Sequence, residues 1–131
     1  MNDQTGHSEE RIGSFTEFWP FYVGEHRDPS NRGFHYIGTT GVLGLAVWAA
    51  VTNIWWMFTL LPICGYGFAW YGHFIVEKNR PASFSYPLWS LFGDFKMYGL
   101  AITGRMRGEV KRLYGSSHPA PDAPLLTSTS Q

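Results

Sequence analysis

Two long apolar stretches, separated by only two polar residues, dominate the middle of the chain. Residues 36–51 and 55–76 contain no Asp, Glu, Lys or Arg, and Thr52 and Asn53 lie between them. A transmembrane helix needs roughly 17–25 predominantly apolar residues. The second stretch meets this length. The first is short unless residues 34 and 35 are added to it, so one of the two spans could be incomplete. The pattern predicts two helices that fold back on each other as a hairpin.

Small residues recur within both stretches at helical spacing. They are Gly38, Gly41 and Gly44 in the first stretch and Gly65, Ala69 and Gly72 in the second. In lipid, helices associate through close backbone packing, which small residues permit, so these positions favour a tight hairpin. We expect Pro62 to kink the second helix, because proline removes an intrahelical hydrogen bond.

The segments on either side of the hairpin have an amphipathic pattern. Residues 12–22 carry apolar side chains at helical spacing behind an S-x-x-E capping box at residues 14–17, and Pro20 is expected to kink or shorten this helix. Residues 88–102 also repeat apolar positions, but Asp94 and a nearby lysine interrupt them. We therefore expect interfacial helices here rather than a third clean span.

These patterns predict an all-α fold, in which a membrane helical hairpin is flanked by amphipathic or interfacial helices. We expect a polar N-terminal leader over residues 1–11 and a single membrane helical domain over residues 12–114. Ser, Pro, Thr and Ala are frequent in residues 115–131, which predicts a disordered C-terminal tail. The leader lacks the basic start and apolar core of a secretory signal peptide.

The composition agrees with a membrane protein. Aromatic residues make up 18% of the chain, and charged residues only 15%, against about 25% in soluble domains. Ten basic and ten acidic residues balance each other, so we expect no nucleic-acid partner. Cys64 is the single cysteine, which excludes an intramolecular disulfide and a cysteine-based zinc site.

Basic residues gather at the two open ends of the predicted hairpin. They are Arg27 and Arg32 before its first helix and Lys78 and Arg80 after its second, whereas the connection at residues 52–53 has none. Positively charged flanks tend to stay on the cytoplasmic side of a membrane. We therefore expect an integral membrane protein whose open hairpin ends face the cytoplasm.

Three histidines lie at these open ends. His26 and His35 precede the first apolar stretch, and His73 lies near the end of the second, so the hairpin brings all three to one membrane face. Neutral imidazole is a common ligand of iron, zinc and copper, which makes the three residues a candidate metal site. Their spacing matches no familiar zinc motif, and a packing or capping role for each is the alternative. His7 and His118 lie in the polar ends and are assigned no role.

Three polar residues are candidates for supporting this site. Asn31 shares a helical face with His35 at four-residue spacing. Glu77 lies one turn beyond His73 and is a candidate metal ligand, a partner that orients the imidazole, or a member of an ion pair with the basic residues after it. Asp94 is an ionisable group in an apolar stretch, and such groups at membrane depth tend to be functional.

The ordered pattern of these residues resembles a family of small membrane proteins. It reads His26-x-x-Pro29-x-Asn31-x-x-x-His35-x-x-Gly38, then Gly65-Tyr66-x-x-x-Trp70-x-Gly72-His73-Phe74-x-x-Glu77-x-Asn79-x-Pro81-Ala82, and finally Pro87-Leu88. The family was long catalogued as a domain of unknown function, and its characterised fungal member is an endoplasmic-reticulum 2-hydroxy-fatty-acid dioxygenase. The likeness covers residues 12–107.

The resemblance implies a dioxygenase that uses Fe²⁺ and O2 to shorten a 2-hydroxy fatty acid by one carbon, as in fatty acid alpha-oxidation, without 2-oxoglutarate. It assigns metal binding and catalysis to His26, His35 and His73, and it makes Glu77 a partner of an imidazole rather than a ligand. Membrane lipid is an implied partner, and assembly into a homo-oligomer is compatible with the resemblance. The implied location is the bacterial inner membrane, or the endoplasmic reticulum in a eukaryote.

For such a substrate, the chain supplies candidate contacts at both ends. The alkyl tail is expected in lipid or in a groove lined by residues such as Trp70 and Tyr66. Arg80 or Asn79 is expected near the carboxylate, which an arginine can bind through two hydrogen bonds.

Two other functions are weighed against this one. A non-catalytic, small integral membrane scaffold or lipid-binding protein would use the histidines for interfacial packing. A membrane di-iron hydroxylase is disfavoured, because the H-x-x-x-H clusters typical of that class are absent from the sequence. Stoichiometric metal that is lost when the histidines are substituted would distinguish an enzyme from a scaffold.

Overall fold

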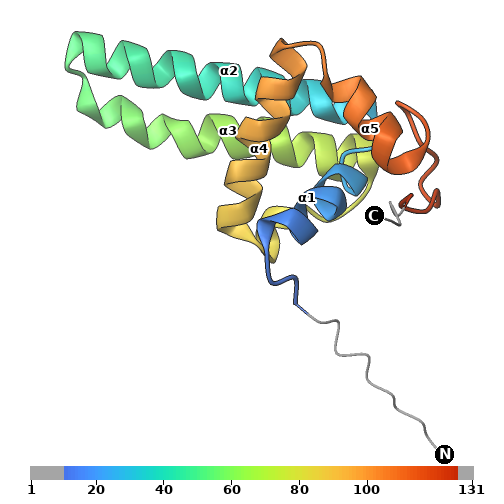
Figure 1. The fold of residues 1–131 in the computed structure, drawn as a ribbon. Coiled ribbons are helices and arrows are strands. Elements are labelled where there is room, and N and C mark those ends of the chain that lie inside the picture. The colour runs from blue at the N-terminus through green and yellow to red at the C-terminus, as the bar shows by residue number, and fades with distance from the viewer. Residues whose placement is uncertain (1–10, 127–131) are drawn as a thin grey trace, which may run out of the picture.

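The chain is all-helical over residues 11–126, which the computed structural model describes; most of the predicted leader and residues 127–131 lie outside this range (Figure 1). The α-helices in this range are α1 (Phe15–Gly24), α2 (Pro29–Thr52), α3 (Leu60–Tyr71), α4 (Pro87–Ile102) and α5 (Met106–Tyr114). Shorter helical segments are a 3-10 helix at Trp55–Thr59, a π-helix at Gly72–Glu77 and a 3-10 helix at Ala82–Phe84. The all-α prediction is confirmed.

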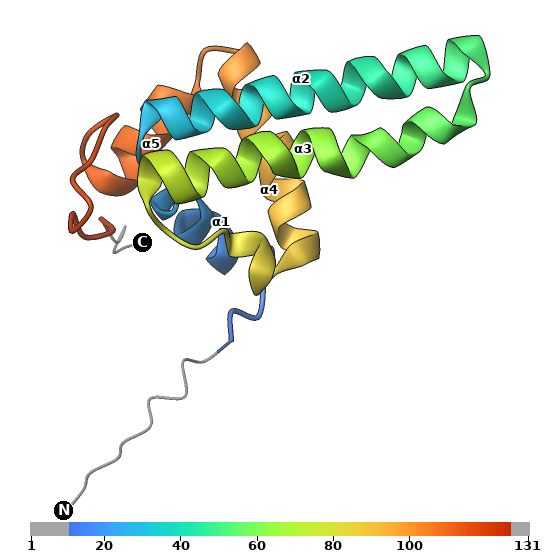
Figure 2. The ribbon, with the colours of Figure 1, turned by 180° about the vertical axis from the view of Figure 1, so that it is seen from behind.

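α2 and α3 form the predicted hairpin, and they lie side by side and antiparallel in both views (Figures 1 and 2). Asp28 caps α2 by accepting a hydrogen bond from the Ser30 amide at 2.8 Å, and Asn53 ends the helix in the left-handed conformation. A Cβ on Gly38 would lie 3.3 Å from the Gly65 carbonyl oxygen. The small residues therefore do allow the two backbones to approach closely.

The second arm of the hairpin is divided into 3-10, α and π segments. Pro62 lies in the first turn of α3, where a missing amide costs no helical hydrogen bond, so it starts a helix rather than kinking one. Within residues 11–126, α2 is the one helix that is long and apolar enough to cross a membrane, and only 17% of its apolar window is buried.

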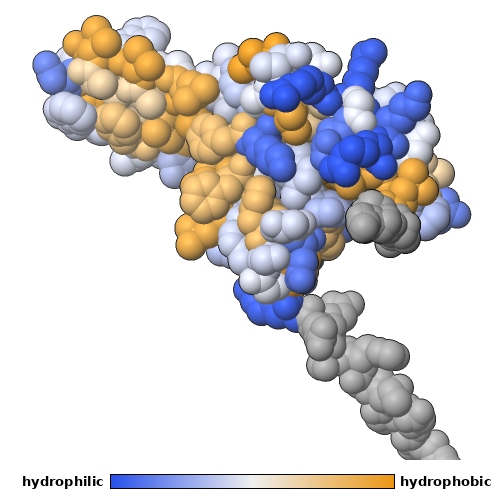
Figure 3. Space-filling view, in the orientation of Figure 1, coloured by the Kyte–Doolittle hydropathy of each residue, from blue (hydrophilic) through white to orange (hydrophobic). Residues whose placement is uncertain are grey.

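α4 crosses the hairpin steeply in Figure 1, and the exposure of its side chains shows that it turns an apolar face outward. Its buried residues are Ser90, Gly93 and Met97, whereas Leu88 and Phe92 are 68% and 60% exposed. A helix on the surface of a soluble protein turns its apolar side inward, so α4 suits surroundings that are themselves apolar. Apolar surface covers the hairpin and part of α4, while polar surface gathers around α5 (Figure 3).

α1 packs with α4 and α5 beside the open end of the hairpin. Ser14 caps α1, because its hydroxyl oxygen accepts a hydrogen bond from the Glu17 amide at 3.2 Å. α1 continues through Pro20 to Gly24, and the Tyr114 hydroxyl donates to the Pro20 carbonyl at 2.8 Å. The cluster of buried apolar residues here includes Phe18, Tyr22, Val23, Met97 and Val110.

The described part of the predicted disordered tail, residues 115–126, lies against the helices. There Arg27 donates hydrogen bonds to the carbonyl oxygens of Ala120 and Ala123 at 2.6 and 2.9 Å. The composition predicts disorder because the segment has few apolar side chains to bury. The contacts come instead from its backbone carbonyls, whose partners are guanidinium groups elsewhere in the chain.

Candidate metal centre

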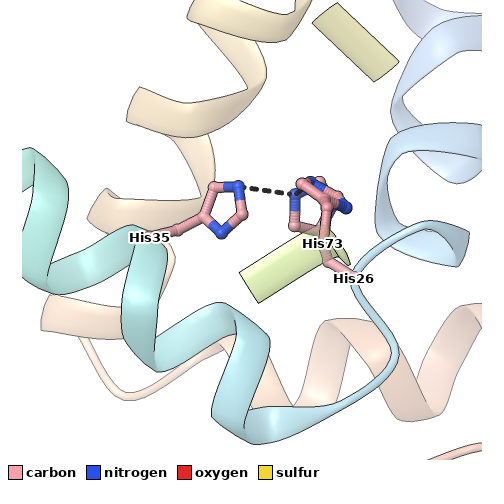
Figure 4. Close-up of side chains that lie close together, drawn as sticks. All are labelled: His26, His35 and His73. Atoms are coloured by element: carbon pink, nitrogen blue, oxygen red, sulfur yellow. Dashed lines mark hydrogen bonds between the residues drawn. The ribbon is translucent and has the colours of Figure 1, made fainter. Parts of the chain in front are cut away.

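Three elements that are far apart in the chain each contribute one histidine to the same buried point (Figure 4). His26 lies in the turn between α1 and α2, His35 lies early in α2, and His73 lies in the π-helix after α3. Each residue is 5% exposed or less. The packing of the hairpin brings His35 and His73 together, and the turn after α1 adds His26.

The ring nitrogens are at distances expected of ligands to one ion. Nε2 of His26 lies 3.1 Å from Nε2 of His35 and 3.1 Å from Nε2 of His73. Nitrogens that each lie about 2.1 Å from one metal ion are about 3.0 Å apart at right angles and about 3.4 Å apart in a tetrahedral arrangement. These two separations fall within this range, and the ligand nitrogens of all three histidines lie within 4.8 Å of one another.

The second nitrogen of each ring fixes where the proton lies. Nδ1 of His26 is 2.6 Å from the Tyr22 carbonyl oxygen, Nδ1 of His35 is 3.0 Å from the Asn31 carbonyl oxygen, and Nδ1 of His73 is 2.7 Å from Oδ1 of Asn79. These oxygens only accept hydrogen bonds, so each Nδ1 carries the proton. Each Nε2 then presents a lone pair, and three lone pairs facing one another repel unless a cation lies among them.

A metal ion fits this arrangement better than a proton does. Burial, followed by the neighbouring His35 and His73, lowers the pKa of His26 well below its usual value, so the ring stays neutral. Neutral imidazoles are ligands that iron, zinc, copper and nickel accept, and three of them leave coordination positions free. The residues present therefore fit a bound metal ion.

The histidines form part of the wall of a cavity of about 270 Å³. Its lining follows α2 from His35 to Val42 and α3 from Leu61 to Trp70, and then reaches His73. At 1.5 Å per residue, residues 35–42 and 61–73 correspond to roughly 10 and 18 Å of helix, so the cavity is long in the direction of the hairpin. α4 closes another side with Pro87, Ser90, Leu91, Asp94 and Phe95.

Trp70 and Tyr66, the predicted contacts of an alkyl tail, both line this cavity. They are 40% and 42% exposed, so the cavity lining reaches the apolar surface at these two residues. Along the hairpin the lining is largely apolar and includes Val42, Leu61 and Pro62.

Asp94 lines the cavity and is linked to the histidines through Tyr22. The Tyr22 hydroxyl donates a hydrogen bond to Oδ1 of Asp94, and the Tyr22 ring stacks on the His26 ring with 4.1 Å between centroids. Burial raises the pKa of Asp94 to about 6, although the hydrogen bond from Tyr22 opposes the shift. Asp94 therefore lies beside the site, with one residue between it and His26.

Asn31 supports His35, but Glu77 does not reach His73. Besides its carbonyl contact with His35, Asn31 places its side-chain amide nitrogen 3.4 Å from Oε1 of Glu77. The same oxygen accepts a hydrogen bond from the Asp28 amide at 2.5 Å. The turn of a π-helix is wider than that of an α-helix, so a four-residue separation does not stack Glu77 on His73. Glu77 instead ties the π-helix to the start of α2, which corrects the predicted contact.

Asn79 holds the position predicted for Glu77. Its Oδ1 accepts the Nδ1 proton of His73, and its amide nitrogen donates to the carbonyl and the carboxylate of Glu25 at 2.9 and 2.8 Å. Asn79 therefore orients His73 from behind, outside the cavity lining. Arg80 is exposed and also lies outside the lining. These positions do not support the substrate contacts predicted for Asn79 and Arg80.

Arg32 is a supporting residue whose place in the sequence indicated only a basic flank of the hairpin. It is 3% exposed, and it donates hydrogen bonds to the carbonyl oxygens of His26 at 2.8 Å, Arg27 at 2.9 Å and Ser117 at 3.0 Å. It therefore holds the turn that carries His26. The feature of the sequence that could have indicated this role is the position of Arg32 at the start of an apolar helix, three residues before His35.

Comparison with protein-family models finds one family that matches most of the chain. A family described as 2-hydroxy-palmitic acid dioxygenase Mpo1-like matches residues 12–106, a range that contains the three histidines. No curated protein and no solved structure matches the chain. The match ends at the first residue of α5, so the rest of that helix and residues 115–126 lie beyond it.

Proposed function

Because the chain belongs to the family described as 2-hydroxy-palmitic acid dioxygenase Mpo1-like, we propose that it is a ferrous-iron dioxygenase that shortens a 2-hydroxy fatty acid by one carbon. Balanced over one O2, R–CH(OH)–COOH gives R–COOH, CO2 and water. The observation that carries the proposal is the convergence of three Nε2 lone pairs in the wall of a long, largely apolar cavity. The proposed metal ligands and catalytic residues are His26, His35 and His73.

The part of the protein in this reaction is to bind and orient the metal and the substrate. Fe²⁺ would supply the redox chemistry with O2. The Nδ1 hydrogen bonds keep each imidazole in one tautomer and direct its Nε2 toward the same point. Because the three rings are neutral, they leave the charge of a divalent ion uncompensated, which favours an anionic head group beside the histidines. The carboxylate of a fatty acid meets this requirement.

The alkyl chain is proposed to follow the cavity along the hairpin, away from the histidines. Val42 and Leu61 offer it apolar walls, and each buried CH2 contributes about 0.8 kcal/mol. Trp70 and Tyr66 are proposed to contact the chain where the lining reaches the surface. Entry there would let the tail pass from lipid into the cavity without crossing water.

We place the protein in a membrane, with the hairpin in the acyl layer and the metal site near its cytoplasmic face. The length and composition of α2 support this location, as do the exposed Trp48, Trp55 and Trp56 near the hairpin tip. The basic residues lie at the opposite, open end of the hairpin. The proposed membrane is the bacterial inner membrane, or the endoplasmic reticulum in a eukaryote.

Reconstitution with defined metals tests this function. The purified chain is stripped with a chelator, reloaded with Fe²⁺, Zn²⁺ or Mn²⁺ without oxygen, and then given 2-hydroxyhexadecanoic acid and O2. We expect O2 uptake and pentadecanoic acid, identified by mass spectrometry, with Fe²⁺ alone. Alanine at His26, His35 or His73 should abolish both and reduce bound metal.

Iron-loaded protein that consumes no O2 with any 2-hydroxy acid would contradict the proposed reaction. Metal-free protein that binds lipid equally well in all three histidine variants would favour the non-catalytic alternative.

A further inference from the structure

Ser90 has a buried hydroxyl group without a partner. The residue is 4% exposed and lines the cavity, and its Oγ makes no hydrogen bond to any part of the chain that the structure describes. A serine within a helix commonly bonds the carbonyl one turn back, but here the Tyr86 carbonyl accepts only from the Ser90 amide. An unpaired buried hydroxyl is costly, so its presence in a cavity wall points to a ligand.

Asp94 lies one helical turn after Ser90 and lines the same cavity. Its Oδ1 accepts from Tyr22, while Oδ2 makes no hydrogen bond within residues 11–126. Gly93 lets the Tyr22 ring approach α4, since a Cβ there would lie 3.0 Å from the ring. The same ring stacks on His26. Ser90 and Asp94 therefore lie in the wall of the same cavity as the histidines, on a different helix, and Tyr22 connects Asp94 to His26.

The two side chains together match the needs of an alcohol. A hydroxyl group both donates and accepts a hydrogen bond, and the pair offers one donor, Ser90 Oγ, and one acceptor, Asp94 Oδ2. A carboxylate, by contrast, would be repelled by Asp94 and attracted by a cation at the histidines. The head of a 2-hydroxy acid carries both groups on adjacent carbons, so it offers a carboxylate to the histidines and a hydroxyl to Ser90 and Asp94.

We propose that Ser90 and Asp94 form a subsite that binds the 2-hydroxyl of the substrate and thereby selects 2-hydroxy acids over plain fatty acids. This inference rests on the proposed function, because it takes the carboxylate to lie at the histidines. A plain fatty acid would leave both polar groups unpaired in the cavity, and a site built around a substrate hydroxyl discriminates strongly against an analogue that lacks it.

Equilibrium binding to the intact, Fe²⁺-loaded chain in detergent without oxygen tests the subsite. The ligands are 2-hydroxyhexadecanoic acid and hexadecanoic acid, and the readout is tryptophan fluorescence, because Trp70 lines the cavity. We expect the wild type to prefer the hydroxy acid at least about tenfold and Ser90→Ala to reduce this preference to within about threefold of equality. Bound metal should be unchanged.

Ser83→Ala is the matched control, since Ser83 is a half-buried serine in the lining of the same cavity. It should keep the preference of the wild type. Ser90→Ala should be at least as thermostable as the wild type, because it removes an unpaired buried hydroxyl from a helix, so misfolding would not explain a lost preference.

Two results would overturn the subsite, and they differ in what they say of the proposed function. If the wild type and Ser90→Ala show the same strong preference, the subsite is wrong and the proposed substrate class stands. If the wild type binds both acids equally, the chain does not recognise the 2-hydroxyl, and the proposed substrate class fails along with the subsite.

Discussion

Asn79, in the loop after the π-helix, holds the orientation and the tautomer of the His73 imidazole. Because its Oδ1 accepts the Nδ1 proton of His73, Asn79→Ala should free the imidazole to rotate or change tautomer. Loss of such a partner typically weakens metal binding by about 10–100-fold. Competition against a chromogenic chelator measures the change. Arg80→Ala is the control, as Arg80 is exposed outside the cavity, and equal affinity in both variants would contradict the role of Asn79.

Asp94 is predicted to reduce the stability of the protein at neutral pH. Burial raises its pKa to about 6 from 3.8, so the folded state holds the proton more tightly than the unfolded state does. Stability from this group is present at low pH and is lost as the pH rises through about 6. Between pH 5 and 7.5 the wild type should lose about 1.4 kcal/mol relative to Asp94→Asn.

Chemical unfolding of both metal-free proteins at the two pH values measures this difference, because the histidines titrate equally in each and cancel. A stability gap that does not change with pH would show that Asp94 is not perturbed. A carboxyl group kept at such a cost is consistent with its proposed role as a hydrogen-bond acceptor for substrate.

The segment after α5, residues 115–126, accepts hydrogen bonds from Arg27 and Arg32 and so supports the turn that carries His26. Deleting residues 116–131 removes the Ser117 carbonyl from Arg32 and the acceptors at Ala120 and Ala123 from Arg27. Removing these acceptors from the buried Arg32 and the half-buried Arg27 should destabilise the fold by about 1–3 kcal/mol and weaken metal binding. Unfolding and chelator competition report the two effects separately.

Arg27→Met in the full-length chain should reproduce part of the loss of stability, because it breaks two of the same contacts. Truncated protein with wild-type stability and metal affinity would show that the segment after α5 is dispensable. Because the matched family range ends at residue 106, this support for the metal centre comes from outside the family domain.

The molecule as a whole has an apolar hairpin at one end and a polar, metal-capable end at the other (Figure 3). In a membrane, the hairpin tip and the segment after α5 should therefore lie on opposite faces. In a Cys64→Ser background, cysteine at Ser116 should react with a membrane-impermeant maleimide from the cytoplasmic face, and cysteine at Thr52 from the other. Labelling of both sites from one face would contradict a spanning hairpin.

The helical hairpin and the clustering of the three histidines could be predicted from the sequence, because both follow from patterns along the chain. Uncharged runs of near-span length predict the hairpin, and a hairpin places residues before its first helix beside residues at the end of its second. His26, His35 and His73 follow from that geometry. The resemblance to the family adds a metal and a substrate class to these expectations.

The partners of those histidines could not be predicted in the same way. Four-residue spacing in an α-helix favours Glu77 as the partner of His73, but the π-helix widens the turn, so that Asn79 takes this place. Composition predicts disorder after residue 114. It carries no information on a contact between distant residues, such as the hydrogen bond that the buried Arg32 donates to the Ser117 carbonyl, 85 residues further along the chain.

The sequence by itself indicated the hairpin and the amphipathic helices before and after it, the stretches that avoid charge and the candidate metal ligands, because these follow from side-chain chemistry and periodicity along the chain. Only the tertiary structure decided that the three Nε2 lone pairs converge and that α4 turns Ser90 and Asp94 inward and its apolar face outward. The physical reason is that lone-pair direction and unpaired hydrogen-bonding groups depend on atoms brought together from distant parts of the chain.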